Sequence, residues 1–130
     1  MPKPKILIVD DEEDIRQTLK YRLESSDYTV ITAGDGIEAL ELAHLECPDL
    51  ILLDIVLPKM DGYQVCRALK ESSNEKYNRI PVIMISGRPQ LLEEKTQATN
   101  IADDYIVKPF DASELLAKIG RLLGEKVRAG

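Results

Sequence analysis

Acidic, hydroxyl and amino side chains follow four short apolar runs of this 130-residue chain. The runs 5–9, 50–53, 82–85 and 105–107 end, in order, at Asp10 and Asp11, at Asp54, at Ser86 and at Lys108. If these runs are parallel strands, their carboxyl ends share one edge of a sheet, where open α/β sheets bind ligands. Such a set could hold a divalent cation and a phosphoryl group beside an acidic nucleophile.

The acids of this set have alternative roles. Two adjacent carboxylates repel each other unless a cation lies between them and a third acid, so Asp10 and Asp11 favour a hard cation such as Mg²⁺. Asp11 could instead be the N-cap of a helix that begins at Glu12. Asp54 ends the most buried run and could be a nucleophile, or it could cap the next turn as an ordinary loop acid.

The loop after Asp54 has the sequence IVLPKMDG. Pro58 fixes its backbone and Gly62 frees it, which predicts a tight turn. Such a loop could direct the backbone carbonyl of Val56 toward a metal, whereas Asp61 is expected to cap the next helix.

The remaining polar candidates lie after the last two strands. Ser86 precedes Gly87, so its hydroxyl could approach a phosphate oxygen closely, or it could form a turn before a helix. Pro109 restricts the backbone of Lys108, whose ammonium is then a phosphate counter-charge or a solvated lysine. Tyr105 is either a half-buried aromatic with its hydroxyl on water or a backbone group, or a switch that turns inward when Ser86 moves.

Strand-like runs alternate with amphipathic helical patterns five times, which predicts a parallel sheet with helices on both faces. The predicted strands are 5–10, 28–33, 50–54, 81–85 and 104–107, and the predicted helices are 12–26, 36–46, 62–73, one that begins near Pro89, and 112–123. The first, third and fourth strands are the most apolar and should be central. In the second helix, Ile37, Leu40 and Ala43 should face inward.

Composition narrows the function classes. The net charge of −6 argues against a nucleic-acid surface, and an acidic chain that binds phosphate needs a local cation. No apolar run approaches the ~18 residues of a membrane span, and the N-terminus leads into a strand without a signal peptide. We therefore expect a cytoplasmic protein without membrane contact. Cys47 and Cys66 are expected to be buried or half-buried free thiols.

Taken in order, these segments resemble the receiver domain of bacterial two-component response regulators. The resemblance rests on ILIVDD at 6–11, LLD at 52–54, LPKMDG at 57–62 and ADDYIVKPF at 102–110. It implies a flavodoxin-like (βα)5 doubly wound parallel sheet with strand order 2-1-3-4-5. We expect the receiver domain over residues 1–124, and a flexible tail or the start of a linker over 125–130.

The resemblance also implies a phosphoacceptor site. Asp54 would accept a phosphoryl group from a sensor histidine kinase or a phosphotransfer protein. Mg²⁺ or Mn²⁺ would be held by Asp11, Asp54 and the backbone carbonyl of Val56, with Asp10 acting mainly through metal-bound water. Because the donor shares the chemistry, we do not expect the chain to be an enzyme in the usual sense.

The other implied roles concern the switch. Ser86, Gly87 and Lys108 would contact phosphoryl oxygens, Ser86 and Tyr105 would form the switch pair, and the Lys108–Pro109 bond would be cis. The surface of the fourth helix, the last strand and the last helix would change shape, and two copies could pair through it.

Two other functions compete with this one. A pseudo-receiver would keep the fold as a protein-binding module without phosphorylation, which the intact set of acids, Ser86 and Lys108 argues against. A metal-dependent phosphatase would use Asp54 on small substrates, but it usually needs a second acid two residues on, where this chain has Val56. The chain is either a stand-alone receiver or a fragment whose effector lies beyond Gly130.

Overall fold

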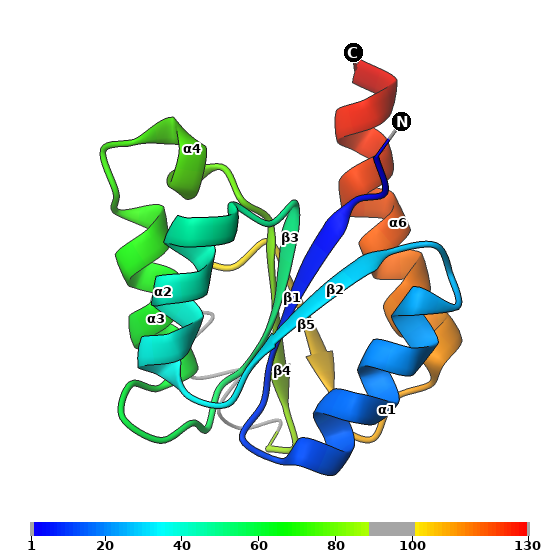
Figure 1. Ribbon diagram of the computed structural model, residues 1–130, viewed down its shortest axis with the longest axis horizontal. Coiled ribbons are helices and arrows are strands. Elements are labelled where there is room, and N and C mark those ends of the chain that lie inside the picture. Colours follow the sequence, from blue (N-terminus) through cyan, green and yellow to red (C-terminus); the bar gives the residue numbers. More distant parts are fainter. Residues whose placement is uncertain (1, 89–100, 130) are drawn as a thin grey trace.

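The computed structural model describes residues 2–88 and 101–129, and Figure 1 shows its elements. The strands are β1 (Lys5–Val9), β2 (Thr29–Ala33), β3 (Leu50–Asp54), β4 (Val82–Ser86) and β5 (Asp104–Val107). The described helices are α1 (Glu13–Glu24), α2 (Gly36–Glu46), α3 (Gly62–Lys70), α4 (Glu75–Asn78) and α6 (Ala112–Ala129). The helix predicted to begin near Pro89 lies outside the described residues.

The strands form one parallel sheet in the order β2-β1-β3-β4-β5. This confirms the predicted order, with β1, β3 and β4 in the centre and β2 at an edge. Helices α2, α3 and α4 lie on one side of the sheet, and α1 and α6 lie on the other (Figure 1). The fold is therefore the expected doubly wound, flavodoxin-like arrangement.

Alternate side chains of the central strands enter two separate cores. Leu53 and Met84 pack with side chains of α2 and α3, whereas Leu52 and Ile83 pack with side chains of α1 and α6. Every residue of β3 and β4 is buried. Successive residues of a strand point to opposite faces, so a strand covered on both sides needs an uninterrupted apolar sequence.

The inner stripe of α2 differs from the one predicted. Ala43 is buried as expected and Leu40 is partly buried, but Ile37 is 44% exposed, and Gly36 and Ala39 are buried in its place. A Cβ atom at residue 36 would lie 2.2 Å from the carbonyl oxygen of Met60. The inner face therefore needs a glycine at residue 36, because the first turn of α2 packs directly against the loop that follows β3.

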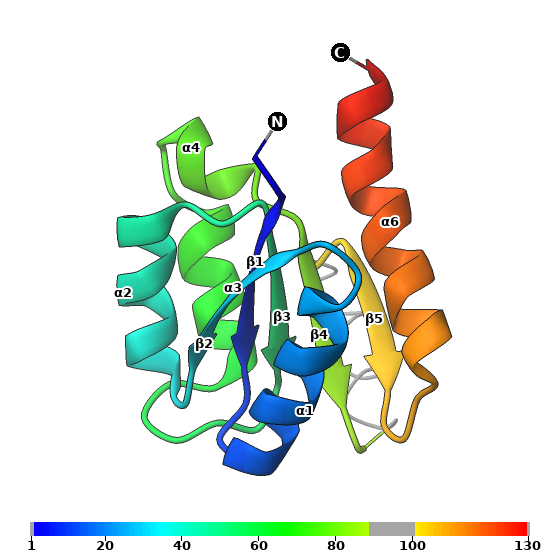
Figure 2. The same cartoon turned by 45° about the vertical axis from the view of Figure 1, so that its right-hand side comes forward.

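The last helix is longer than its apolar pattern predicted. The core-facing apolar pattern ends at Leu123, but α6 continues to Ala129, so the predicted end of this helix at residue 123 is wrong. A flexible tail over 125–130 stays a prediction. The sequence EKVRA contains mostly good helix formers, which can extend a helix that is already anchored. Figure 2 shows the end of α6 projecting past the sheet. The division into 1–124 and a linker stays a prediction.

Asp103 fixes the beginning of β4. Its carboxylate accepts a hydrogen bond from the backbone amide of Val82, and its own amide donates to the carbonyl of Val82. The ammonium of Lys70, at the end of α3, lies 2.8 Å from the same carboxylate and 2.8 Å from the carbonyl of Ile80. These bonds hold the amino-terminal ends of β4 and β5 and the end of α3 together.

The two cysteines are free thiols in different surroundings. Cys66 belongs to α3 and is fully buried in the core, whereas Cys47 is partly exposed at the end of α2. Burial raises the pKa of the Cys66 thiol from 9.0 to about 11. Thiols react as thiolates, so Cys66 should be inert in the folded protein at neutral pH.

We expect a thiol reagent such as Ellman's reagent to modify only Cys47 in the native chain, and both cysteines in urea. The pKa of Cys66 is higher in the folded state than in the unfolded state. The buried neutral thiol therefore contributes to stability below pH 9, and this contribution falls as pH rises toward 11. Absorbance of the released thiolate, with Cys47→Ala as control, measures the reactivity. Rapid native labelling of Cys47→Ala would contradict this expectation.

Candidate functional site

The predicted polar residues do lie at one edge of the sheet. Asp10 directly follows β1, Asp54 is the last residue of β3, Ser86 is the last residue of β4, and Lys108 directly follows β5. Asp10, Asp54 and Ser86 are buried polar residues, which are rare unless they are paired or functional. The parallel topology therefore brings together side chains that are up to 98 residues apart in sequence.

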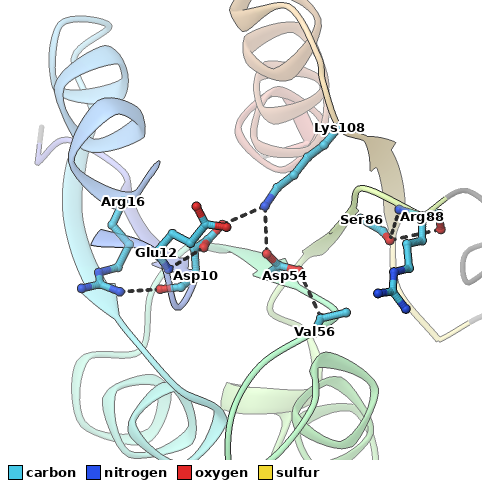
Figure 3. A network of polar contacts seen from close by, with 8 residues as sticks. All are labelled: Asp10, Glu12, Arg16, Asp54, Val56, Ser86, Arg88 and Lys108. Atoms are coloured by element: carbon cyan, nitrogen blue, oxygen red, sulfur yellow. Dashed lines mark hydrogen bonds and ion pairs between the residues drawn. The ribbon is translucent and has the colours of Figure 1, made fainter. Parts of the chain in front are cut away.

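Lys108 connects two of the acids. Its Nζ atom donates to the carboxylate of Asp10 at 3.0 Å and to that of Asp54 at 2.9 Å (Figure 3). The backbone amide of Lys108 also donates to the carbonyl of Ser86 at 2.7 Å. The Lys108–Pro109 peptide bond is cis, as predicted. The two contacts with carboxylates show that the ammonium of Lys108 points inward, between the ends of two strands, and that Lys108 is not a solvated lysine.

Burial and neighbouring charges shift the pKa values of this pair. Burial raises the pKa of the Asp54 carboxyl, and the charge of Asp10 adds to the rise, while Lys108 opposes it without cancelling it. Burial lowers the pKa of the Lys108 ammonium, but its hydrogen bonds to Asp54 and Asp10 outweigh that effect and the pKa is raised. The site therefore concentrates negative charge that one lysine only partly offsets.

Every polar atom of Asp10 has a partner. Its amide donates to the carbonyl of Ala33, its carbonyl accepts from Arg16, and its two carboxylate oxygens accept from the amide of Glu12 and from Lys108. The alternative role of Asp11 as N-cap is wrong, because the N-cap of α1 is Glu12, which makes no side-chain capping bond. The carboxylate of Asp10 binds this amide instead, so Asp11 stays exposed.

The oxygen donors beside Asp10 suit a hard divalent cation. Carboxylate oxygens of Asp10, Asp11 and Glu12 all lie within 4.8 Å of one another, and Mg²⁺ prefers such ligands together with several waters. Glu12 was not among the predicted ligands. Within the described residues this group does not include Asp54, whose carboxylate instead contacts Lys108. A cation shared by Asp11, Asp54 and the carbonyl of Val56 stays a prediction.

The loop after β3 is held tightly against Asp54. The amide of Val56 donates to the Asp54 carboxylate at 3.1 Å, so this acid does form the local bond expected of an ordinary loop acid. Asp61 caps α3 in a reciprocal capping box with Gln64, which confirms its predicted role. A Cβ atom at Gly62 would lie 2.4 Å from the carbonyl oxygen of Asp54. Only glycine allows the backbone of α3 to approach the acid so closely.

Ser86 forms a turn in this conformation. Its hydroxyl accepts from the amide of Arg88 at 2.9 Å and lies 3.1 Å from the Arg88 carbonyl, to which it donates. Figure 3 shows Ser86 and Arg88 together on the side of Asp54 away from Asp10. Gly87 is exposed, and the nearest atom to a Cβ there would be the Cβ of Lys108 at 3.9 Å. Contact of Ser86 and Gly87 with a phosphoryl group stays a prediction.

Tyr105 has an unusual hydroxyl. The side chain packs against the core formed with α3, and its oxygen is buried without a hydrogen bond to the described residues. Burial raises its pKa; the Ala102 amide opposes that rise but does not reach hydrogen-bonding geometry. The side chain is half-buried, as one interpretation predicted, and its role as a switch stays a prediction.

Sequence reasoning missed two residues of this site, Glu12 and Arg16. Side chains of a helix point back toward its amino terminus. An arginine in the first turns of α1 can therefore reach the turn that carries Asp10, Asp11 and Glu12. That rule, applied to the predicted helix, was the signal available in the sequence.

The family model of the response regulator receiver domain matches residues 6–120, and the chain belongs to this family. A similar curated protein is the probable transcriptional regulator ycf27 of Guillardia theta, 46% identical over 93% of this chain and 46% of that protein. Another is the alkaline phosphatase synthesis transcriptional regulatory protein PhoP of Bacillus subtilis, 44% identical over 92% of this chain and 48% of that protein. The chain spans about half the length of these relatives.

Solved structures agree with this assignment. The receiver domain of sensor histidine kinase PA1611 from Pseudomonas aeruginosa is 30% identical, has a TM-score of 0.84, and covers 94% of this chain and 98% of its own length. That structure holds a magnesium ion coordinated in its active site cleft. Within the described part of the present chain, no helix is long and apolar enough to cross a membrane.

Proposed function

We propose that this receiver domain accepts a phosphoryl group on Asp54 from a histidine kinase or a phosphotransfer protein. The contact of Lys108 with both Asp10 and Asp54 carries the proposal, because it places a cation beside a buried carboxylate at the edge where the sheet binds ligands. A merely protein-binding module would have no need to bury Asp10 and Asp54 together. The pseudo-receiver alternative is therefore not favoured.

In the proposed step, an Asp54 oxygen attacks the phosphorus of phosphohistidine. The new P–O bond forms as the P–N bond breaks, and the imidazole nitrogen leaves with the bonding electron pair. Each carboxylate oxygen has two lone pairs, so Asp54 can bind Lys108 and the Val56 amide and still attack. Lys108 offsets charge on the transferred group, which makes the catalysis mainly positioning and electrostatics.

Asp10, Asp11 and Asp54, with the carbonyl of Val56, would hold Mg²⁺ or Mn²⁺, and the proximity of Glu12 supports an acidic cation site here. When bound, the ion would supply positive charge against the phosphoryl oxygens. We expect acetyl phosphate with Mg²⁺ to add one phosphoryl group to the chain, as measured by intact-mass spectrometry, and EDTA to prevent it. Equal labelling in EDTA would contradict the metal requirement.

The phosphorylated site should then act as a switch. We propose that the phosphoryl group draws the hydroxyl of Ser86 from Arg88, and that Tyr105 and the surface around β5 and α6 respond. Phosphorylation would shift a population between two conformations rather than create a new one. We also propose that the protein is cytoplasmic, that two copies pair through this surface, and that the domain binds no nucleic acid. We further propose that the domain does not turn over substrate as an enzyme.

The phosphoryl group should be long-lived. Val56, at the edge of the site, is 56% exposed and has no side-chain group that could orient a hydrolytic water. We expect decay over much longer than seconds after acetyl phosphate is removed, followed by the loss of phosphorylated mass. Val56→Gln should shorten the lifetime, whereas Leu45→Gln, at an exposed apolar position in α2, should not. Loss of the wild-type phosphoryl group within seconds would refute this.

A further inference from the structure

Arg16 holds both ends of the turn that carries the acids. Its backbone amide donates to the carbonyl of Glu12 at 3.1 Å, and its guanidinium donates to the carbonyl of Asp10 at 2.6 Å. Figure 3 shows the side chain reaching back along α1 to Asp10. Since Glu12 provides no side-chain cap, these two bonds and the bond from Glu12 to Asp10 determine the shape of the turn.

The guanidinium of Arg16 lies in a space kept open by Gly34, the residue after β2. A Cβ atom at residue 34 would be 3.2 Å from Nη1 and 3.7 Å from Cζ of Arg16, so an alanine would be in tight contact and the guanidinium would have to shift by a few tenths of an ångström. The neighbouring residue Ala33 accepts a hydrogen bond from the amide of Asp10 at 3.2 Å. Gly34 and Arg16 thus form one arrangement around the backbone of Asp10.

We propose that Arg16 is a positioning residue for divalent-cation binding, and that Gly34 is needed to accommodate it. This inference rests on the proposed cation site. Arg16 does not contact the ion in this proposal; it fixes the backbone from which the three clustered carboxylates project. Its positive charge alone would repel a cation, so positioning and charge predict opposite effects when Arg16 is removed.

The affinity for Mn²⁺, followed through the EPR signal of the free ion, tests the proposal. Arg16→Met should weaken binding about tenfold, as is typical for residues that orient metal ligands. Arg16→Lys should restore part of the affinity, because an ammonium can also donate to the carbonyl of Asp10. Arg22→Met, an exposed arginine later in α1, removes the same charge and should leave the affinity unchanged.

Glycine variants test the arrangement separately. Gly34→Ala should weaken Mn²⁺ binding in the wild-type background and add no further loss to Arg16→Met, since both changes disturb one contact. Gly120→Ala, where a Cβ would meet nothing within 4 Å, is the control. Urea unfolding of each variant separates affinity from stability, because a merely structural role would lower the unfolding free energy without weakening Mn²⁺ binding to the folded chain.

Unchanged or tighter Mn²⁺ binding by Arg16→Met would overturn the inference while the proposed function stands. Absence of Mn²⁺ binding by the wild-type chain would overturn both. Additive losses in Gly34→Ala and Arg16→Met would refute the part assigned to Gly34.

Discussion

Asp54→Asn is expected to take up no phosphoryl group from acetyl phosphate under conditions in which the wild-type chain is labelled. Asparagine has nearly the same shape as aspartate but lacks the anionic oxygen that attacks phosphorus. The loss should therefore be complete rather than partial. Intact-mass spectrometry measures it directly, and hydroxylamine should remove the wild-type label, because it cleaves acyl phosphates.

The matched control for this variant is Asp27→Asn. Asp27 is an exposed aspartate in a turn with φ of 69°, a conformation that asparagine adopts as readily as aspartate. It should be phosphorylated like the wild type. Labelling of Asp54→Asn at the wild-type rate would move the acceptor to another residue and refute the proposed function.

Lys108→Met is expected to destabilise the chain by about 2 kcal/mol at neutral pH, because it leaves two buried carboxylates without their shared cation. The partial exposure of the lysine keeps the cost below that of a fully buried pair. Without Lys108, the pKa of Asp54 rises further above its unfolded value. The destabilisation should therefore be full above the folded pKa of Asp54 and should shrink as pH falls toward the unfolded value, since both states then bind the proton.

Urea unfolding at several pH values measures this dependence. Lys20→Met, which removes the same charge from α1, is the control and should show a small effect at every pH. A loss that stays constant from neutral to acidic pH would show that the aliphatic stem of Lys108, rather than its charge, stabilises the fold.

The sequence pattern predicted the sheet and most of the site because both depend on where the apolar runs of the strands begin and end. Strands covered on two faces are continuously apolar, so β3 and β4 were recognised, and polar residues that end such strands must share an edge. Asp10, Asp54 and Lys108 follow from that rule. Ser86 also lies at this edge, but which partner its hydroxyl binds depends on local turn geometry that the pattern does not contain.

The errors arose where packing distance or helix propensity outweighed hydrophobicity. Ile37 is the more apolar residue, but the close approach of Met60 requires glycine at residue 36 on the inner face of α2, where Ala39 is also buried. In α6, the core pattern stops at Leu123 although the residues beyond it favour helix. Arg16 was missed because its importance depends on a side chain that reaches back over a full turn of α1.

The bonds of Asp103 to Val82 have a consequence for how a signal can travel. They anchor the base of a strand whose opposite tip carries Ser86, while Lys70 ties that base to α3. Because β4 is held at its amino-terminal end and is buried between two cores, it cannot shift along its own axis. A conformational change caused by phosphorylation of Asp54 must therefore be a local rearrangement at the carboxyl end of β4. The rest of the strand would keep its position.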